Sequence, residues 1–213
     1  MLALVTGFEK FGPYPVNPTQ DLMIQLDGKM FGDVVIHAVT LPAIYGVSSC
    51  LLDLVDELDP EMVISFGLAS RIPRLRLETY GRNWMESNYA DNRGVIATGE
   101  KIDPDGPNFC RTNIDAIGLA HALHQASVPV DISVDAEAFV CNALIYQIIL
   151  CLCHSSQKVL FTYFHTPWPD RYLDRITLEP GKVTIPWETL ERTVRITAVF
   201  LRDEISRAQA GRR

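Results

Sequence analysis

The stretch VVIHAVTLPAIYGVSSCLLDLVDELDPEMVISFG, residues 34–67, places a helical pattern between two β-branched runs. The first run, residues 34–42, and the last, residues 62–67, are typical of strands. Between them, leucine and valine recur at helical spacing over residues 48–58. Two strands joined through a helix usually lie parallel in one sheet. The stretch therefore predicts an α/β fold with a largely parallel sheet.

The rest of the chain repeats this alternation. Further strands are expected at 2–6, 130–134 and 158–164, and further helices at about 19–27, 113–126, 139–153 and 186–208. Residues 71–83 alternate in part, which places Glu78 near a strand end, and residues 86–112 hold many turn formers typical of an exposed loop or hairpin. We expect a three-layer α/β/α sandwich with a mostly parallel central sheet, forming a single domain over residues 1–213.

Composition narrows the class of protein. Apolar residues make up 47% and charged residues 21%, which is ordinary for a globular chain. The formal net charge of -7 repels phosphate, so we expect no nucleic acid partner. The amino terminus lacks a basic leader, and no apolar window reaches the roughly 18 residues that span a bilayer. We therefore expect a cytoplasmic protein that does not enter a membrane.

The cysteines fit a reducing compartment. There are five of them, an odd number without the compact spacing of a small disulfide-rich domain. Cys151 and Cys153 form a C-x-C pair inside an apolar run, with no second pair to complete a zinc site, so we expect them to pack in the core. No metal ion or organic cofactor is expected.

Two reactive side chains stand where sites form in open α/β sheets, beyond the carboxyl ends of strands. Cys141 follows the strand expected at 130–134 and lies in the first turn of an apolar helix, where free backbone N–H groups favour a thiolate. His165 is expected directly after the strand at 158–164. An imidazole can take the thiol proton, and the Glu78 carboxylate can orient the imidazole. From spacing alone, a buried cysteine and a structural histidine remain the commoner roles.

Four segments carry a resemblance to a known family. TGFEKFG (6–12), NPT (17–19), EAFVCN (137–142) and FHTP (164–167) resemble, in order and spacing, the signatures of pyroglutamyl peptidase I, a family of cysteine peptidases. The resemblance implies that the catalytic residues are Glu78, Cys141 and His165. It also implies a pyroglutamate pocket, whose lining carries over to Phe8, Phe11, Phe139 and Val140.

Asn17 matches an asparagine that supports this pocket in the family, although helix capping alone would also explain it. Aromatic walls suit a small, flat, uncharged ring, whereas the charged side chain of a free glutamate would lose its hydration there.

The chain departs from the family at several positions. Lys10 replaces a proline, and Glu137 replaces a glycine in the turn before the cysteine, where glycine would permit a positive φ. In NYADNRG (88–94), Asn88 stands where the family has an arginine beside the oxyanion, and Tyr89 where it has a pocket isoleucine. Leu68 replaces a glutamine. Asn88 is therefore a candidate oxyanion contact that offers one neutral hydrogen bond.

The expected function is that of an omega-peptidase that removes N-terminal pyroglutamate from peptides through a thioester intermediate. Homo-oligomers, dimers or tetramers, are implied by the resemblance. The alternative is a catalytically impaired homologue that binds a cyclic or blocked peptide N-terminus. A nucleoside phosphorylase-like enzyme is disfavoured because the chain has no Gly-rich phosphate cradle.

Overall fold

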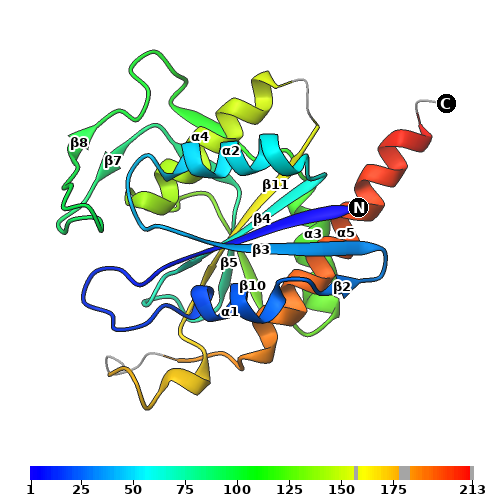
Figure 1. The fold of residues 1–213 in the computed structure, drawn as a ribbon, viewed down its shortest axis with the longest axis horizontal. Helices are drawn as coiled ribbons and strands as arrows, with labels where there is room; N and C mark the ends of the chain where they lie inside the picture. Colours follow the sequence, from blue (N-terminus) through cyan, green and yellow to red (C-terminus); the bar gives the residue numbers. More distant parts are fainter. Residues whose placement is uncertain (156–157, 178–182, 212–213) are drawn as a thin grey trace.

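A computed structural model describes residues 1–155, 158–177 and 183–211. At its centre lies a seven-stranded sheet in the order β10, β5, β11, β4, β1, β3, β2 (Figure 1). The strands are β1 (Leu2–Phe8), β2 (Met30–Phe31), β3 (Val34–Leu41), β4 (Met62–Leu68), β5 (Leu75–Glu78), β10 (Val130–Ser133) and β11 (Leu160–Thr166). Strand β1 pairs in parallel with β3 and β4, β4 with β11, and β10 with β5. Only the β5–β11 and β2–β3 pairs in this sheet are antiparallel among the described residues, which confirms the expected sheet.

Helices cover both faces of the sheet (Figure 1). They are α1 (Pro18–Leu26), α2 (Val47–Leu58), α3 (Ala116–Gln125), α4 (Val140–His154) and α5 (Glu188–Ala210). Helices α1, α3 and α5 share one apolar cluster with the sheet, and α2 and α4 share the other. A short 3₁₀ turn, η1 (Asp170–Tyr172), precedes α5. The three-layer α/β/α prediction is confirmed. No helix in the described part of the chain has both the length and the apolar content to cross a membrane.

The segment expected as an exposed loop or hairpin contains short strands. Strand β6 (Tyr80–Arg82) pairs with β9 (Phe109–Arg111), and β7 (Met85–Glu86) with β8 (Thr98–Glu100). Asn142 ties this segment to α4: its Oδ1 accepts from the Arg82 N–H at 2.8 Å, and its Nδ2 donates to the carbonyls of Arg82 and Trp84, each at 2.8 Å. The start of α4 is thereby fixed against β6.

Two expectations about placement are wrong. His165 lies within β11 and not after it, because the parallel ladder with β4 continues through the pairs His165–Gly67 and Thr166–Leu68. Cys151 and Cys153 are exposed and do not pack in the core. At its C-terminal end α4 turns Leu152 toward the apolar cluster, so the two cysteines that flank this leucine face outward.

The turn before α4 keeps a glycine-like conformation without a glycine. Glu137 has a φ of 65°, in the left-handed region. Two hydrogen bonds to the backbone groups of Glu137 hold the turn. The Glu137 N–H donates to Asp135 Oδ1 at 3.0 Å, and the Glu137 carbonyl accepts from Arg82 Nη2 at 3.2 Å. A side chain in this region costs about 1–2 kcal/mol, which glycine would not incur.

Replacing Glu137 with glycine should therefore raise the free energy of unfolding by about 1 kcal/mol, because both backbone hydrogen bonds persist and the strain is relieved. Urea denaturation measures this. Glu137→Ala is the matched control, because it removes the same carboxylate but retains a Cβ atom. A glycine variant less stable than the alanine variant would show that the turn is unstrained, because only the larger unfolded-state entropy of glycine would then act.

Candidate active site

Glu78 and His165 come together on neighbouring strands. Glu78 ends β5, and antiparallel pairing places it opposite Tyr163 of β11. From there its Oε1 reaches diagonally to His165 Nδ1, at 2.8 Å. Both side chains are buried, with 1% of Glu78 and 6% of His165 exposed. A carboxylate in this position fixes the orientation of the imidazole and stabilises its protonated form.

Cys141 is the third member of the candidate group, and it comes from helix α4 and not from the sheet. It is the second residue of α4 and is half-buried. Gly67 of β4, the strand partner of His165, leaves room for it: a Cβ atom at Gly67 would overlap the Tyr163 hydroxyl and stand only 3.0 Å from Cys141 Sγ. The thiol therefore lies over Gly67 of β4, which is the strand neighbour of His165 on β11.

The charge state of His165 follows from these neighbours. Burial alone would lower the pKa of His165, but the charge of the Cys141 thiolate, its hydrogen bond to the ring, and the hydrogen bond and charge of Glu78 together raise that pKa to about 10. At neutral pH the ring therefore holds a proton, and its positive charge lies beside Cys141.

The start of α4 adds a further favourable field. Phe139 is the N-cap residue and makes no side-chain cap hydrogen bond. The first N–H groups of a helix lack intrahelical partners and carry the positive end of the helix dipole. At Cys141 they can stabilise negative charge on the sulfur or on an oxygen bound beside it.

An aromatic cluster adjoins the cysteine. The ring of Phe139 lies with its centroid 6.0 Å from Phe11, 5.6 Å from Tyr45 and 4.9 Å from Tyr89. Burial, followed by the charge of Asp91, raises the pKa of Tyr45 to about 12, so its hydroxyl is neutral at physiological pH. Four rings from distant parts of the chain thus pack into one aromatic cluster around Phe139. Phe8 and Val140 are buried in the apolar cluster beneath it.

The segment 88–94 is fastened to the first motif. Asp91 Oδ2 accepts from the Tyr45 N–H at 2.8 Å, while Asn92 Nδ2 donates to Glu9 Oε1 and to the Lys10 carbonyl, each at 2.8 Å. Burial would raise the pKa of Asp91, but backbone N–H groups of Val95, Tyr45 and Arg93 lower it below its usual value. These contacts hold Tyr89 against Phe139.

The remaining candidate residues play distinct parts. Asn17 caps α1, accepting from the Thr19 N–H at 3.1 Å, and also donates to the Glu9 carbonyl at 2.9 Å, which holds the loop after β1. Asn88 is exposed on the segment just before Tyr89. Leu68 is buried in the cluster under α1, α3 and α5 and offers no polar group to a ligand.

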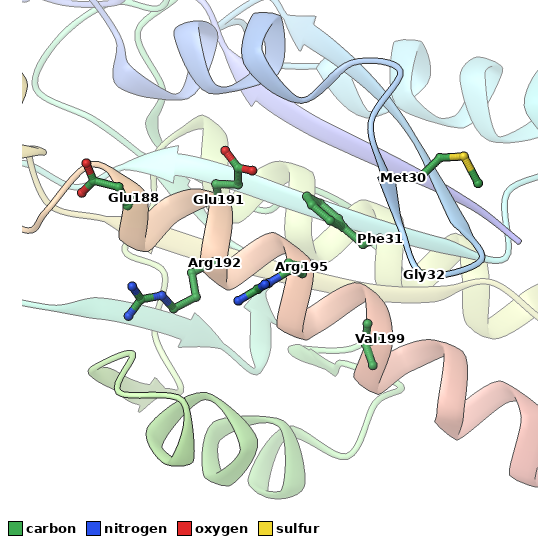
Figure 2. Close-up of a pocket in the computed structure, with 8 residues that line it drawn as sticks. All are labelled: Met30, Phe31, Gly32, Glu188, Glu191, Arg192, Arg195 and Val199. Carbon is green, nitrogen blue, oxygen red and sulfur yellow. The ribbon is translucent and has the colours of Figure 1, made fainter.

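A separate hollow of about 630 Å³ lies between the β2–β3 turn and α5 (Figure 2). Met30 and Phe31 line one side of it, and Arg192, Arg195 and Val199 of α5 line another. None of the elements that carry Glu78, Cys141 or His165 contributes to its lining. Among the described residues, no group of three or more histidines, cysteines and acidic side chains is placed to hold a metal ion.

Comparison with known proteins agrees with this geometry. The family model described as pyroglutamyl peptidase matches residues 1–203. The chain belongs to the pyroglutamyl peptidase family. It is 32% identical over 213 residues to the pyrrolidone-carboxylate peptidase of Cupriavidus taiwanensis, covering 98% of this chain and 97% of that protein. The corresponding protein of Pyrococcus furiosus is 30% identical over 191 residues, covering 87% of this chain and 88% of its own length.

Solved structures match as well. A mutant pyrrolidone carboxyl peptidase from P. furiosus superposes with a TM-score of 0.89 at 25% identity, covering 96% of this chain and 99% of that one. Membership of the family makes the chain a cysteine peptidase of the pyroglutamyl-peptidase I type.

Several residues beside the candidate site are not among those expected from the sequence. Tyr45 lies in a loop with no motif, and only the fold brings it to Phe139. Asn142 is part of the EAFVCN segment, but its clamp on Arg82 cannot be inferred from spacing. Tyr163 did leave a signal: it is two residues before His165 in a strand, so the two side chains share a face.

The raised pKa of His165 can be measured directly. Histidine-labelled protein titrated by NMR should show the ring losing its proton near pH 10, and both Glu78→Gln and Cys141→Ala should lower that midpoint. Because the folded pKa lies above the ordinary 6.5, this proton's contribution to the free energy of unfolding is complete below about pH 6.5 and is lost as pH rises through about 10. A ring that titrates near pH 6.5 would contradict the ion pair.

Proposed function

We propose that this peptidase hydrolyses the bond after an N-terminal pyroglutamyl residue, with Cys141 as nucleophile, His165 as acid and base, and Glu78 as the group that orients the histidine. The observation that carries the proposal is the buried 2.8 Å hydrogen bond between Glu78 and His165 beside a thiol at a helix start. The names of the relatives, which refer to pyrrolidone carboxylate, supply the substrate class.

The first half of the reaction makes a thioester. The Cys141 thiolate attacks the carbonyl carbon of the pyroglutamyl residue, and the carbon–nitrogen bond of the peptide breaks. The imidazolium of His165 gives its proton to the departing amine, which leaves as the new N-terminus of the shortened peptide. Glu78 holds the ring in one orientation throughout.

The second half releases the product. His165, now neutral, takes a proton from a water molecule as that water attacks the thioester carbon. The carbon–sulfur bond breaks, free pyroglutamate leaves, and the thiolate–imidazolium pair is restored. The sequence balances in protons and electrons without any cofactor.

The start of α4 supports the proposed oxyanion. Since Phe139 makes no side-chain cap hydrogen bond, the backbone N–H groups of the first turn are available to a developing negative oxygen. We assign the role of a neutral additional donor to Asn88, which precedes Tyr89 at the edge of the aromatic cluster. A neutral donor stabilises an oxyanion less than the charged arginine of the family would.

The proposed pocket for the pyroglutamyl ring is formed by the side chains of Phe11, Phe139 and Tyr89. Phe8 and Val140, which are buried in the adjoining apolar cluster, complete the proposed lining. Aromatic faces suit a flat lactam ring, and they disfavour a charged glutamate side chain. Asn17 supports the pocket indirectly, because it holds the loop that presents Phe11. The proposed cellular setting is the cytoplasm, and the proposed assembly is a homo-oligomer, dimer or tetramer, as the family resemblance implies.

Release of the fluorophore from pyroglutamyl-aminomethylcoumarin under reducing conditions tests the function. The intact protein should cleave this substrate and not its proline or alanine counterparts, because only the lactam is both uncharged at nitrogen and able to fill the pocket. Cys141→Ala should lose activity by at least about a thousandfold, as expected when a covalent nucleophile is removed.

Cys110→Ala is the matched control, since Cys110 is buried elsewhere and should leave turnover unchanged. A folded protein that binds a pyroglutamyl peptide without turning it over would instead favour the impaired homologue that recognises a blocked N-terminus. Turnover that survives in Cys141→Ala would refute the proposed nucleophile.

A further inference from the structure

Tyr163 occupies a central and completely enclosed position. It lies in the middle of β11 with 0% of its surface exposed. It shares a face with His165, and the two ring centroids are 5.1 Å apart in an edge-to-face arrangement. Its side chain is thus packed directly beneath the proposed catalytic ion pair.

The hydroxyl of Tyr163 lacks an ordinary partner. Among the described residues, no atom forms a hydrogen bond of ordinary geometry with it, and Cys141 Sγ is no exception. The hydroxyl of its cross-strand neighbour Ser65 is already bonded to the Thr6 hydroxyl at 2.7 Å. A buried hydroxyl left without a partner is costly, so a hydrogen-bond acceptor is expected close by.

Cys141 is the potential acceptor that lies near this hydroxyl. The Tyr163 hydroxyl and Cys141 Sγ both lie next to Gly67 of β4. A Cβ atom added at Gly67 would overlap the hydroxyl and would stand 3.0 Å from the sulfur. After burial, the charge of Cys141 and a hydrogen bond to it are the main causes that raise the pKa of Tyr163 well above 10, with Glu78 adding a smaller effect. The phenol therefore stays neutral near pH 7 and keeps a proton that it can donate in a hydrogen bond.

The other titratable groups that face Cys141 are few. His165 on β11 and Glu78 on β5 form the ion-pair side, and the phenols of Tyr45 and Tyr89 lie on the pocket side. Burial, followed by nearby negative charge, raises the pKa of both phenols, so neither is ionised near neutral pH. Only His165 among these groups brings a positive charge to the sulfur.

We propose that Tyr163 is a further catalytic residue, whose hydroxyl donates a hydrogen bond to the Cys141 thiolate. The proposal rests on the proposed function, in which Cys141 is the nucleophile. A hydrogen bond to a thiolate stabilises its charge and fixes the direction of the sulfur lone pairs. Together with His165, Tyr163 holds the sulfur between two donors, so that the attacking atom is oriented before substrate binds.

The test is the rate of alkylation of Cys141 by iodoacetamide as a function of pH, resolved from the other four cysteines by peptide mass mapping. Tyr163→Phe should move the midpoint of this profile upward by about one pH unit, because a charge-assisted hydrogen bond is lost. Replacing Tyr163 with 3-fluorotyrosine, a more acidic donor, should move the midpoint downward. A purely structural side chain would not produce opposite shifts.

Tyr172→Phe is the matched control, because this buried phenol donates to Asp21 on the other side of the sheet and should leave the midpoint unchanged. A rapidly alkylated Cys141 whose midpoint is the same in wild type, Tyr163→Phe and the fluorotyrosine protein would overturn the role of Tyr163 alone. A wild-type Cys141 that reacts no faster than Cys110 would overturn the proposed nucleophile, and this inference with it.

Discussion

The buried contact between Glu78 and His165 is the constraint on which the candidate site depends. A carboxylate with 1% exposure is costly unless it is paired, and here a single hydrogen bond of 2.8 Å to an imidazole provides the pairing. The hydrogen bond forms only when His165 carries a proton on Nδ1. The carboxylate of Glu78 therefore fixes both the orientation and the tautomer of the imidazole. The interactions of His165 with Cys141 and with Glu78 together raise the pKa of His165.

The fold supplies this arrangement through the order of its strands. Strand β11 lies between β4 and β5, so one residue row carries Glu78 beside Tyr163, and the next row on that face carries His165 beside Gly67. The absence of a side chain at Gly67 lets the first turn of α4 come close to the sheet with its cysteine. Asn142 then fastens this turn to β6. Each of these features serves to bring one sulfur atom to one imidazole.

The sequence predicts the framework well because periodic apolar patterns report directly on strands and helices. The sequence predicts every long element of the sandwich within a few residues and places the reactive side chains near strand or helix ends.

The errors have a common physical origin. The sequence pattern ends the strand at Phe164, whereas the ladder with β4, a long-range contact, extends it by two residues and includes His165. Apolar neighbours do not reveal which side of a helix faces the sheet, so the sequence wrongly predicts Cys151 and Cys153 in the core. The aromatic cluster around Phe139 likewise joins residues from distant segments, and local patterns carry no record of that convergence.

In the proposed mechanism, the sulfur of Cys141 carries the acyl group during turnover. The most direct measurement mixes the protein with a reactive pyroglutamyl ester, stops the reaction with acid within milliseconds, and maps the modified peptide by mass spectrometry. We expect a pyroglutamyl thioester on Cys141, which accumulates because esters acylate faster than thioesters hydrolyse, and which is absent from Cys141→Ala. Turnover of the ester without any acyl group on Cys141, or with the acyl group on another residue, would exclude Cys141 as the acyl carrier.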